Sequence, residues 1–162
     1  MKYMTLKPEA MKILKPLYII EASQIMFYKQ LSAVANKLGF LRAEKYFLAE
    51  SQEEATHFDK WQQYIVGRGN DFQVPGIEAP EDSSKNLYEL IESALKMEIE
   101  VSDMYNEAAM KLMGVDQLAY QECIDFLKIQ NEAISTYTDY CAVLEGLDKD
   151  GQLVAEHSLF ED

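Results

Sequence analysis

The segment GNDFQVPGIEAPEDSS, residues 69–84, interrupts the helical pattern of this chain for sixteen positions. It contains two prolines and two glycines and has no helical periodicity. Connections of this length are uncommon inside compact domains. At about 3.3 Å per residue, an extended stretch can run the whole length of a helical bundle. The chain is therefore expected to consist of two helical halves that one long crossover joins.

The flanking sequence predicts two long helices before the crossover, and two long helices and one short one after it. Gly39 is placed to end the first helix as a C-terminal glycine. Pro8 suits the first turn of that helix, since proline is favoured there. Pro16 either kinks the helix or moves its start to about Leu14. The expected helices cover residues 8–38, 41–66, 85–113, 117–145 and 152–160.

The connections fix the topology of these helices. The first and second helices should form an antiparallel hairpin, as should the third and fourth, because their turns are short. Asp116 is the expected cap of the fourth helix, and Asp82, Ser83 or Ser84 that of the third. The crossover returns the chain along the bundle, which an up-down bundle would not require. We therefore predict an all-α four-helix bundle with one long crossover and a short C-terminal helix.

Composition and charge restrict the class of protein. A length of 162 residues predicts one domain, residues 1–162. The net charge of -13 argues against binding to nucleic acid or to an anionic membrane. No apolar run approaches the ~20 residues of a membrane span, and the N-terminal sequence does not resemble a signal peptide. Cys123 and Cys141 would lie roughly 27 Å apart on one helix, so no disulfide within the subunit is expected. Free cysteines fit a reducing compartment, and the cytoplasm is therefore the expected location.

Every long helix carries a polar residue within its expected apolar stripe. These residues are Glu21 on the first helix, Glu54 and His57 on the second, Glu98 on the third and Gln130 on the fourth. Counting residues from the turns places all of them near the middle of the bundle, within about 5 Å in height. Along the fourth helix the expected stripe consists of Leu127, Ile134, Tyr137, Cys141 and Leu144.

A buried carboxylate without a partner is very costly, so such a group must meet a proton or a cation. Glu54 and His57 share one helix face because they are three residues apart. Three carboxylates with one imidazole suit iron or manganese better than a metal that prefers thiolates. The pattern thus predicts a metal site in the middle of the bundle, in which Glu54 could bridge two ions.

Several motifs resemble ferritins in their order and spacing along nearly the whole chain. They are Leu6-Lys7-Pro8-Glu9, the pair Glu21 and Tyr28, Gln52-Glu53-Glu54-x-x-His57, Ile77-Glu78-Ala79-Pro80, the helical Glu98, and Gln130-x-x-Ala133. The resemblance implies the ferritin-like form of the bundle and a di-iron ferroxidase site. In such proteins Fe(II) is oxidised with O2 or H2O2, and Fe(III) is stored as mineral inside a shell of 24 subunits.

The resemblance also implies roles for single residues. Glu21, Glu54 and His57 would bind the first iron, and Glu98, with Gln130 beside it, the second. Tyr28 would be a redox-active or hydrogen-bonding tyrosine near the irons. Glu53 and Glu132 match part of a third iron site of bacterial ferritins, whereas Ile129 and Ala133 depart from it.

The same comparison separates this chain from ferritin relatives that use other cofactors. Bacterioferritins and rubrerythrins carry a second Glu-x-x-His on the fourth helix, which is missing here. Ala55 stands where bacterioferritins have their haem-binding methionine, so no haem is expected. Two alternatives stay open: a non-storing di-iron oxidase or peroxidase, and a metal-free ferritin-like partner subunit.

Overall fold

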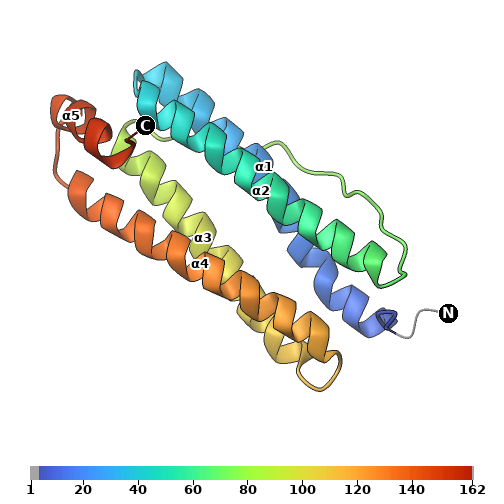
Figure 1. The fold of residues 1–162 in the computed structure, drawn as a ribbon. Coiled ribbons are helices and arrows are strands. Elements are labelled where there is room, and N and C mark those ends of the chain that lie inside the picture. The colour runs from blue at the N-terminus through green and yellow to red at the C-terminus, as the bar shows by residue number, and fades with distance from the viewer. Residues whose placement is uncertain (1–3, 162) are drawn as a thin grey trace.

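The computed structural model describes residues 4–161, and all regular elements within that range are helices. The four long helices are α1 (Pro8–Leu38), α2 (Leu41–Gly67), α3 (Leu87–Leu112) and α4 (Gln117–Leu144), and a short helix follows, α5 (Lys149–Leu159). The helices α1 and α2 form one hairpin, and α3 and α4 form the other (Figure 1). The predicted bundle with one long crossover is confirmed.

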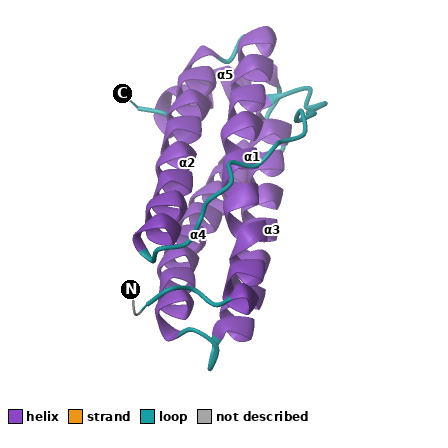
Figure 2. Cartoon of the chain, turned by 90° about the vertical axis from the view of Figure 1, so that its right-hand side faces the viewer, coloured by secondary structure: helices purple, strands orange, loops and turns teal. Residues whose placement is uncertain are grey.

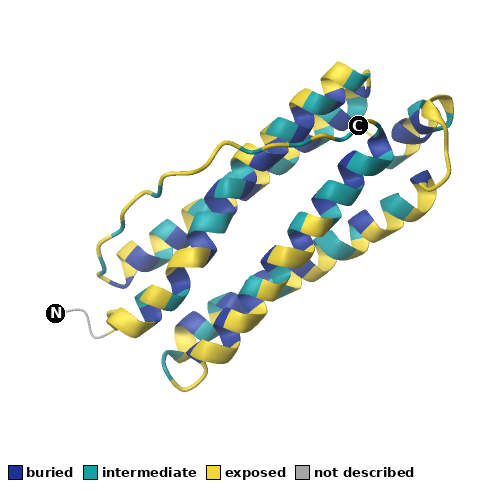
Figure 3. Ribbon diagram, turned by 180° about the vertical axis from the view of Figure 1, so that it is seen from behind, coloured by how far each residue is buried: buried dark blue, intermediate teal, exposed yellow. Residues whose placement is uncertain are grey.

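The connection between α2 and α3 runs back along the first hairpin and leads the chain to the opposite end of the bundle (Figure 2). It is largely exposed, whereas the buried residues lie on the inward faces of the helices (Figure 3). No helix within residues 4–161 combines the length and apolar character needed to cross a membrane.

The structure corrects the predicted cap of α3 and confirms the predicted end of α1. The cap of α3 is Asn86, whose side chain accepts a hydrogen bond from the N–H of Glu89, so the expected caps at residues 82–84 were wrong. Pro16 lies within an α1 that begins at Pro8, which removes the alternative start at Leu14. Gly39 has φ of 90° and ends α1 as predicted, because this left-handed conformation is strained for other residues.

The stripe expected on α4 was also partly wrong. Leu127, Ile134 and Cys141 are only half-buried. The residues that α4 buries are Ala119, Cys123, Phe126, Gln130, Tyr137 and Leu144. The error arises because apolar residues occupy neighbouring positions, so two adjacent helical faces match the same spacing.

Helix α5 closes one end of the bundle and adds hydrogen-bond acceptors at the starts of α2 and α3. Phe40, the N-cap residue of α2, makes no side-chain cap. Instead, the carboxylate of Glu156 accepts a 3.2 Å hydrogen bond from the N–H of Ala43 in the first turn of α2. The side chain of Gln152 likewise accepts a 2.8 Å bond from the N–H of Leu87, the first residue of α3. The short helix therefore satisfies backbone donors on both hairpins.

Candidate metal centre

A polar layer divides the core of the bundle into two apolar clusters. One cluster contains Leu14, Trp61 and Tyr105, and the other contains Tyr28, Phe47 and Tyr137. The residues of the layer come from all four long helices, and each has at most 5% of its surface exposed: Glu21, Gln24, Glu54, His57, Glu98 and Gln130. The structure therefore brings together the five polar residues that the sequence singled out, and Gln24 with them.

Three of these side chains form a compact group that could hold a metal ion. One ligand atom from each of Glu21, Glu54 and His57 lies within 4.8 Å of the others. The Nδ1 atom of His57 is 3.0 Å from Oε2 of Glu54 and 3.6 Å from Oε2 of Glu21. Both α2 residues face the same side because they are one helical turn apart.

Glu21 offers an oxygen to this group that lacks a hydrogen-bond donor in the part of the chain that the structure describes. Its Oε1 accepts a 2.6 Å hydrogen bond from the hydroxyl of Tyr105, which in turn accepts a 2.8 Å bond from the indole N–H of Trp61. Its Oε2 is buried and has no hydrogen-bond partner within residues 4–161. An unsatisfied buried carboxylate oxygen is costly, and a bound cation would remove this cost. The residues present therefore fit a cation-binding role.

Glu98 lies beside the compact group, and donors from two other helices fix its orientation. The hydroxyl of Tyr28 and the amide of Gln24, both on α1, donate to Oε1, the amide at 3.2 Å. The amide of Gln130 on α4 donates to Oε2 at 2.9 Å. Burial raises the pKa of Glu98, and these three neutral donors oppose that rise, so they favour the charged form of the carboxylate, which attracts cations.

The electrostatics of the layer favour the binding of positive charge. Burial raises the pKa of Glu54 to about 9, although the hydrogen bond to His57 opposes the shift and the nearby Glu21 adds to it. Burial alone would lower the pKa of His57, but Glu21 and Glu54 raise it to about 10. Without a metal, the layer therefore holds protons at neutral pH in place of cations. A metal ion that binds here would displace these protons.

Glu53 occupies a different place from the other acidic residues of the predicted site. Its side chain is 65% exposed, and its Oε1 lies 3.6 Å from Nε2 of His57, on the side away from Glu54. Glu53 therefore lies beside the outer nitrogen of the ring and leaves Nδ1 for a metal, and carboxylates beside metal-binding histidines commonly orient the ring. Glu132 is exposed on α4, and within residues 4–161 no compact acidic group unites it with Glu53.

Two aromatic residues around Glu21 were not predicted from the sequence as part of the site. Tyr105 and Trp61 are fully buried and orient this carboxylate, but they were not considered as part of the site. The signal was present on the third helix, where Glu98, Val101 and Tyr105 follow each other at spacings of three and four. A tyrosine at such a position is indistinguishable from an ordinary core residue until its hydroxyl partner is known.

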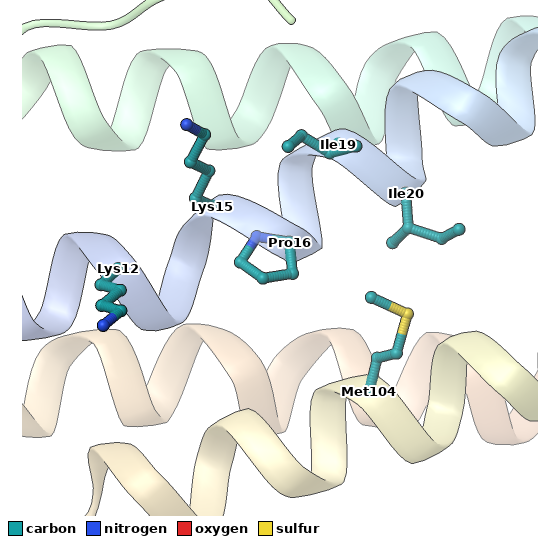
Figure 4. Close-up of a pocket in the computed structure, with 6 residues that line it drawn as sticks. All are labelled: Lys12, Lys15, Pro16, Ile19, Ile20 and Met104. Atoms are coloured by element: carbon teal, nitrogen blue, oxygen red, sulfur yellow. The ribbon is translucent and has the colours of Figure 1, made fainter. Parts of the chain in front are cut away.

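One surface pocket lies outside this layer. It lies between α1 and α3, and Lys12, Lys15, Pro16, Ile19, Ile20 and Met104 line it (Figure 4). These side chains are mostly apolar or cationic, and none of them is a carboxylate or an imidazole. The pocket therefore does not contribute to a cation site.

Comparison with known proteins places the chain in a family. The family model described as Ferritin-like domain matches residues 19–147. Bacterial non-heme ferritin from Escherichia coli strain CFT073 is 29% identical over 108 residues, which cover 67% of this chain but only 66% of that protein. A probable bacterial non-heme ferritin-like protein of Haemophilus influenzae is 26% identical over 148 residues, 91% of this chain and 90% of its own length.

Solved structures show the same fold. An open-pore ferritin from the hyperthermophilic archaeon Archaeoglobus fulgidus superposes with a TM-score of 0.91 and 18% identity, over 98% of this chain and 99% of that chain. A form of the same archaeal ferritin engineered to be closed superposes with a TM-score of 0.90 and 17% identity, over 98% of both chains.

Proposed function

The chain belongs to the ferritin family, and on that premise we propose that it is an iron-storage protein with ferroxidase activity. Its mid-bundle layer would bind Fe(II) as substrate, promote its oxidation to Fe(III) by O2 or H2O2, and release the product to a mineral. We further propose that residues 1–162 form one domain and that copies of it assemble into a shell, with 24 subunits as the expected number.

The observation that carries this proposal is the group formed by Glu21, Glu54 and His57. Two carboxylates and one imidazole are ligands that suit iron, and the unsatisfied Oε2 of Glu21 lies among them. We assign the first Fe(II) to these three residues. A change from Fe(II) to Fe(III) adds one positive charge, which buried carboxylates stabilise more strongly than water does because the local dielectric constant is low.

We assign a second Fe(II) to Glu98, with Glu54 as the bridging carboxylate and Gln130 beside it. The support for this is that the negative charge of Glu98 helps to raise the pKa of Glu54, so the two carboxylates lie close to each other. Two iron ions would together supply two electrons, which is the number that converts O2 and two protons into H2O2. Glu53 is proposed to orient His57 or to guide Fe(II) to it from the surface, and Tyr28 to hold Glu98.

Three further properties belong to the proposed function. Haem is not expected, because the relatives described above are non-haem ferritins and Ala55 replaces the haem methionine. A reducing compartment such as the cytoplasm fits Cys123 and Cys141, which are both free. Assembly into a shell is supported by the match to ferritin folds over 98% of the chain.

The test is an oxidation assay on the assembled protein. Fe(II) is added without oxygen, and air is then admitted while the Fe(III) absorbance and the soluble iron are followed. We expect rapid oxidation and a soluble core in the wild type, and neither in the Glu54→Ala or His57→Ala variants. Glu100→Ala and His157→Ala, which alter exposed residues of the same types, should behave as the wild type does. Oxidation no faster than in buffer would overturn the proposal.

Light scattering tests the storage part separately. If the protein assembles into a shell, the measured particle mass should correspond to many subunits. A particle of one or two subunits that still oxidises Fe(II) would favour a non-storing oxidase, and a protein that binds less than about one metal ion per subunit would favour a structural subunit.

A further inference from the structure

Gln24 belongs to the polar layer, but the function proposed above gives it no contact with iron. It lies on α1 between Glu21 and Tyr28, at spacings of three and four residues, so the three side chains share one face of the helix. Its side chain is fully buried, with 0% exposure. Burial of an amide is costly unless its donors and its acceptor find partners, so a specific cause is needed for this glutamine.

The two polar atoms of the Gln24 amide have different surroundings. Its Nε2 atom donates a 3.2 Å hydrogen bond to Oε1 of Glu98 on α3. Its Oε1 atom is buried and has no hydrogen-bond partner within residues 4–161. An ionised carboxylate only accepts hydrogen bonds, so turning the amide around would set two oxygen acceptors against each other. Glu98 therefore fixes the amide in the orientation that leaves its oxygen without a donor.

A second oxygen atom shares this condition, and it lies on the same face of α1. Among the residues that the structure describes, the buried side-chain atoms that lack a hydrogen-bond partner are Oε2 of Glu21 and Oε1 of Gln24. The two residues are about one helical turn apart, and both belong to the polar layer. Buried polar groups in proteins are nearly always hydrogen-bonded, so two neighbouring exceptions point to a positively charged ligand at this level of the bundle.

The amide oxygen of Gln24 lies within reach of a cation beside Glu98. The oxygen and the nitrogen of an amide are about 2.2 Å apart, since both are bonded to one carbon. Oε1 of Gln24 is therefore at most about 5.5 Å from Oε1 of Glu98. When the N–H on the oxygen's side of the amide donates to Glu98, this separation falls to about 4 Å. Two oxygens that bind one divalent cation at about 2.2 Å each are no more than about 4.4 Å apart.

Glu98 alone offers little to a cation, because hydrogen bonds already occupy most of its acceptor sites. Tyr28 and Gln24 donate to its Oε1, and Gln130 donates to its Oε2. A carboxylate has about four acceptor sites, so three donors leave about one site for a metal ion. A cation at this position therefore needs further oxygens, and Gln24 supplies one without adding negative charge to a buried layer.

The ligands within reach of this second position also differ in kind from those of the first. The chain has two histidines, and the imidazole of His57 belongs to the compact group with Glu21 and Glu54. The other histidine, His157, is exposed on α5. The position beside Glu98 is thus left with oxygen ligands, which suit Mn(II) better than they suit Zn(II), whereas imidazole suits Zn(II) well.

We propose that Gln24 binds the cation beside Glu98 through its amide oxygen, and that this position thereby discriminates against Zn(II) more strongly than the position at His57 does. The proposal rests on the second Fe(II) position of the function proposed above, to which it adds a ligand and a metal preference. The preference serves that function, because Zn(II) has no redox chemistry and would block a position at which Fe(II) must be oxidised.

Two simpler roles for Gln24 predict different results. As a positioning residue, it would act only through its N–H, by holding Glu98. As a packing residue, it would only fill the space between α1 and α3. In neither role does the acceptor atom of Gln24 affect which metal ion binds. Substitutions that change this atom therefore separate binding of the cation from both other roles.

Calorimetric titrations of the assembled, metal-free protein with Mn(II) and with Zn(II), both without oxygen, test the proposal. The binding step that Glu98→Gln removes is assigned to the second position. In the wild type we expect two steps per subunit, with a ratio of Zn(II) to Mn(II) affinity that is severalfold lower at the second position than at the first. This comparison needs no change at Gln24, so it does not depend on the folding of a variant at that residue.

Two substitutions change the acceptor atom of Gln24. Gln24→Leu removes it, and we expect the Mn(II) affinity of the second position to fall roughly 10-fold or more, as it does when even an outer partner of a metal ligand is lost. The first position should not change. Gln24→His offers a nitrogen in place of the oxygen, and the ratio of Zn(II) to Mn(II) affinity at the second position should rise severalfold. Gln30→Leu, at a half-buried glutamine of α1 outside the polar layer, is the matched control and should match the wild type.

The location of the bound ion gives an independent readout in the wild type. In a crystal soaked with Mn(II), an anomalous peak beside Glu98 should lie within about 2.5 Å of Oε1 of Gln24. A peak beside Glu98 that lies farther from this oxygen would overturn the assignment of Gln24 as a ligand.

The proposal is also overturned if Gln24→Leu binds Mn(II) as the wild type does, if Gln24→His leaves the affinity ratio unchanged, or if the two wild-type positions have equal ratios. A wild type that binds one cation per subunit would overturn it together with the second Fe(II) position. A wild type that binds two cations with the expected ratios but oxidises no Fe(II) would refute the ferroxidase function and support the ligand assignment. The two failures are therefore distinguishable.

Discussion

The hydroxyl of Tyr105 on α3 donates a 2.6 Å hydrogen bond to Oε1 of Glu21 on α1, and this bond turns the other oxygen of Glu21 toward His57. A carboxylate that a neutral donor holds in place loses less conformational entropy when it binds a cation. The contact therefore prepares the first ion position before any ion arrives.

Removal of this contact should weaken metal binding. In Tyr105→Phe we expect the affinity for the first Fe(II) to fall roughly 10- to 100-fold, as is usual when a residue that orients a metal ligand is lost. Calorimetric titration with Fe(II) under argon measures this affinity. Tyr88→Phe, at a half-buried tyrosine of the same helix, is the control. Equal affinities of Tyr105→Phe and the wild type would show that the bond does not prepare the site.

The stability of the metal-free protein should fall as the pH rises, because Glu54 and His57 hold protons more tightly in the folded state than in the unfolded chain. In the unfolded chain, glutamate and histidine lose their protons near pH 4.3 and 6.5, respectively. In the folded state the pKa of Glu54 is about 9 and that of His57 about 10. The folded protein thus binds more protons than the unfolded one between about pH 6 and pH 9, so its stability must fall as the pH rises through this window.

Thermal melts of chelator-treated protein measure this dependence. We expect a lower melting temperature at about pH 9 than at about pH 6, a smaller difference in Glu54→Gln, and recovery when a divalent metal ion is added. A melting temperature that rises over this range would contradict the assigned pKa directions.

The docking of α5 should depend on the cap that Glu156 provides to α2. Glu156→Ala removes the only acceptor described for the N–H of Ala43 within residues 4–161, and loss of an N-terminal cap costs about 1 kcal/mol. Hydrogen exchange of α5 and of the first turn of α2 should therefore become faster. Exposed Glu161 is the matched control, and faster exchange in Glu161→Ala as well would exclude the capping role.

An ion pair at the opposite end of the bundle should contribute to stability above acidic pH. Arg68 binds Asp116 with two hydrogen bonds, of 3.2 and 2.7 Å, and thereby joins the end of α2 to the start of α4. Arg68→Lys loses this paired geometry, and we expect it to lower the free energy of unfolding by about 1–2 kcal/mol.

The pH dependence of this effect has a definite sign. The hydrogen bonds from Arg68 lower the pKa of Asp116 in the folded state, so the contribution is present above the unfolded pKa of about 3.9 and is lost as the pH falls through the lower folded value. Denaturant melts should show a gap between wild type and Arg68→Lys at neutral pH that shrinks below about pH 4. A gap that does not depend on pH would mean that Arg68 acts through its packing.

The sequence was sufficient for the topology because turns and helix stops carry strong local signals. Gly39 and the crossover at residues 69–84 predicted the two hairpins, and the structure confirms them. The polar residues of the core could also be predicted from the sequence. A carboxylate on the apolar face of a helix stands out, and five such polar residues fall at one height of the bundle. The assignment of iron to these residues stays a prediction.

Contacts between distant residues could not be predicted. The bonds from Tyr105 to Glu21 and from Glu156 to Ala43 join residues 84 and 113 positions apart, and nothing in the local pattern marks them. The choice between two adjacent apolar faces on α4 likewise depends on how the hairpins pack. These features arise from tertiary packing, which overrides local spacing.

The most direct test of the metal centre is an anomalous difference map, recorded at the iron absorption edge, of a crystal soaked anaerobically with Fe(II). We expect one peak among Glu21, Glu54 and His57 and a second beside Glu98, with Glu54 between the two. Iron density found only at exposed carboxylates, with none in the mid-bundle layer, would contradict it.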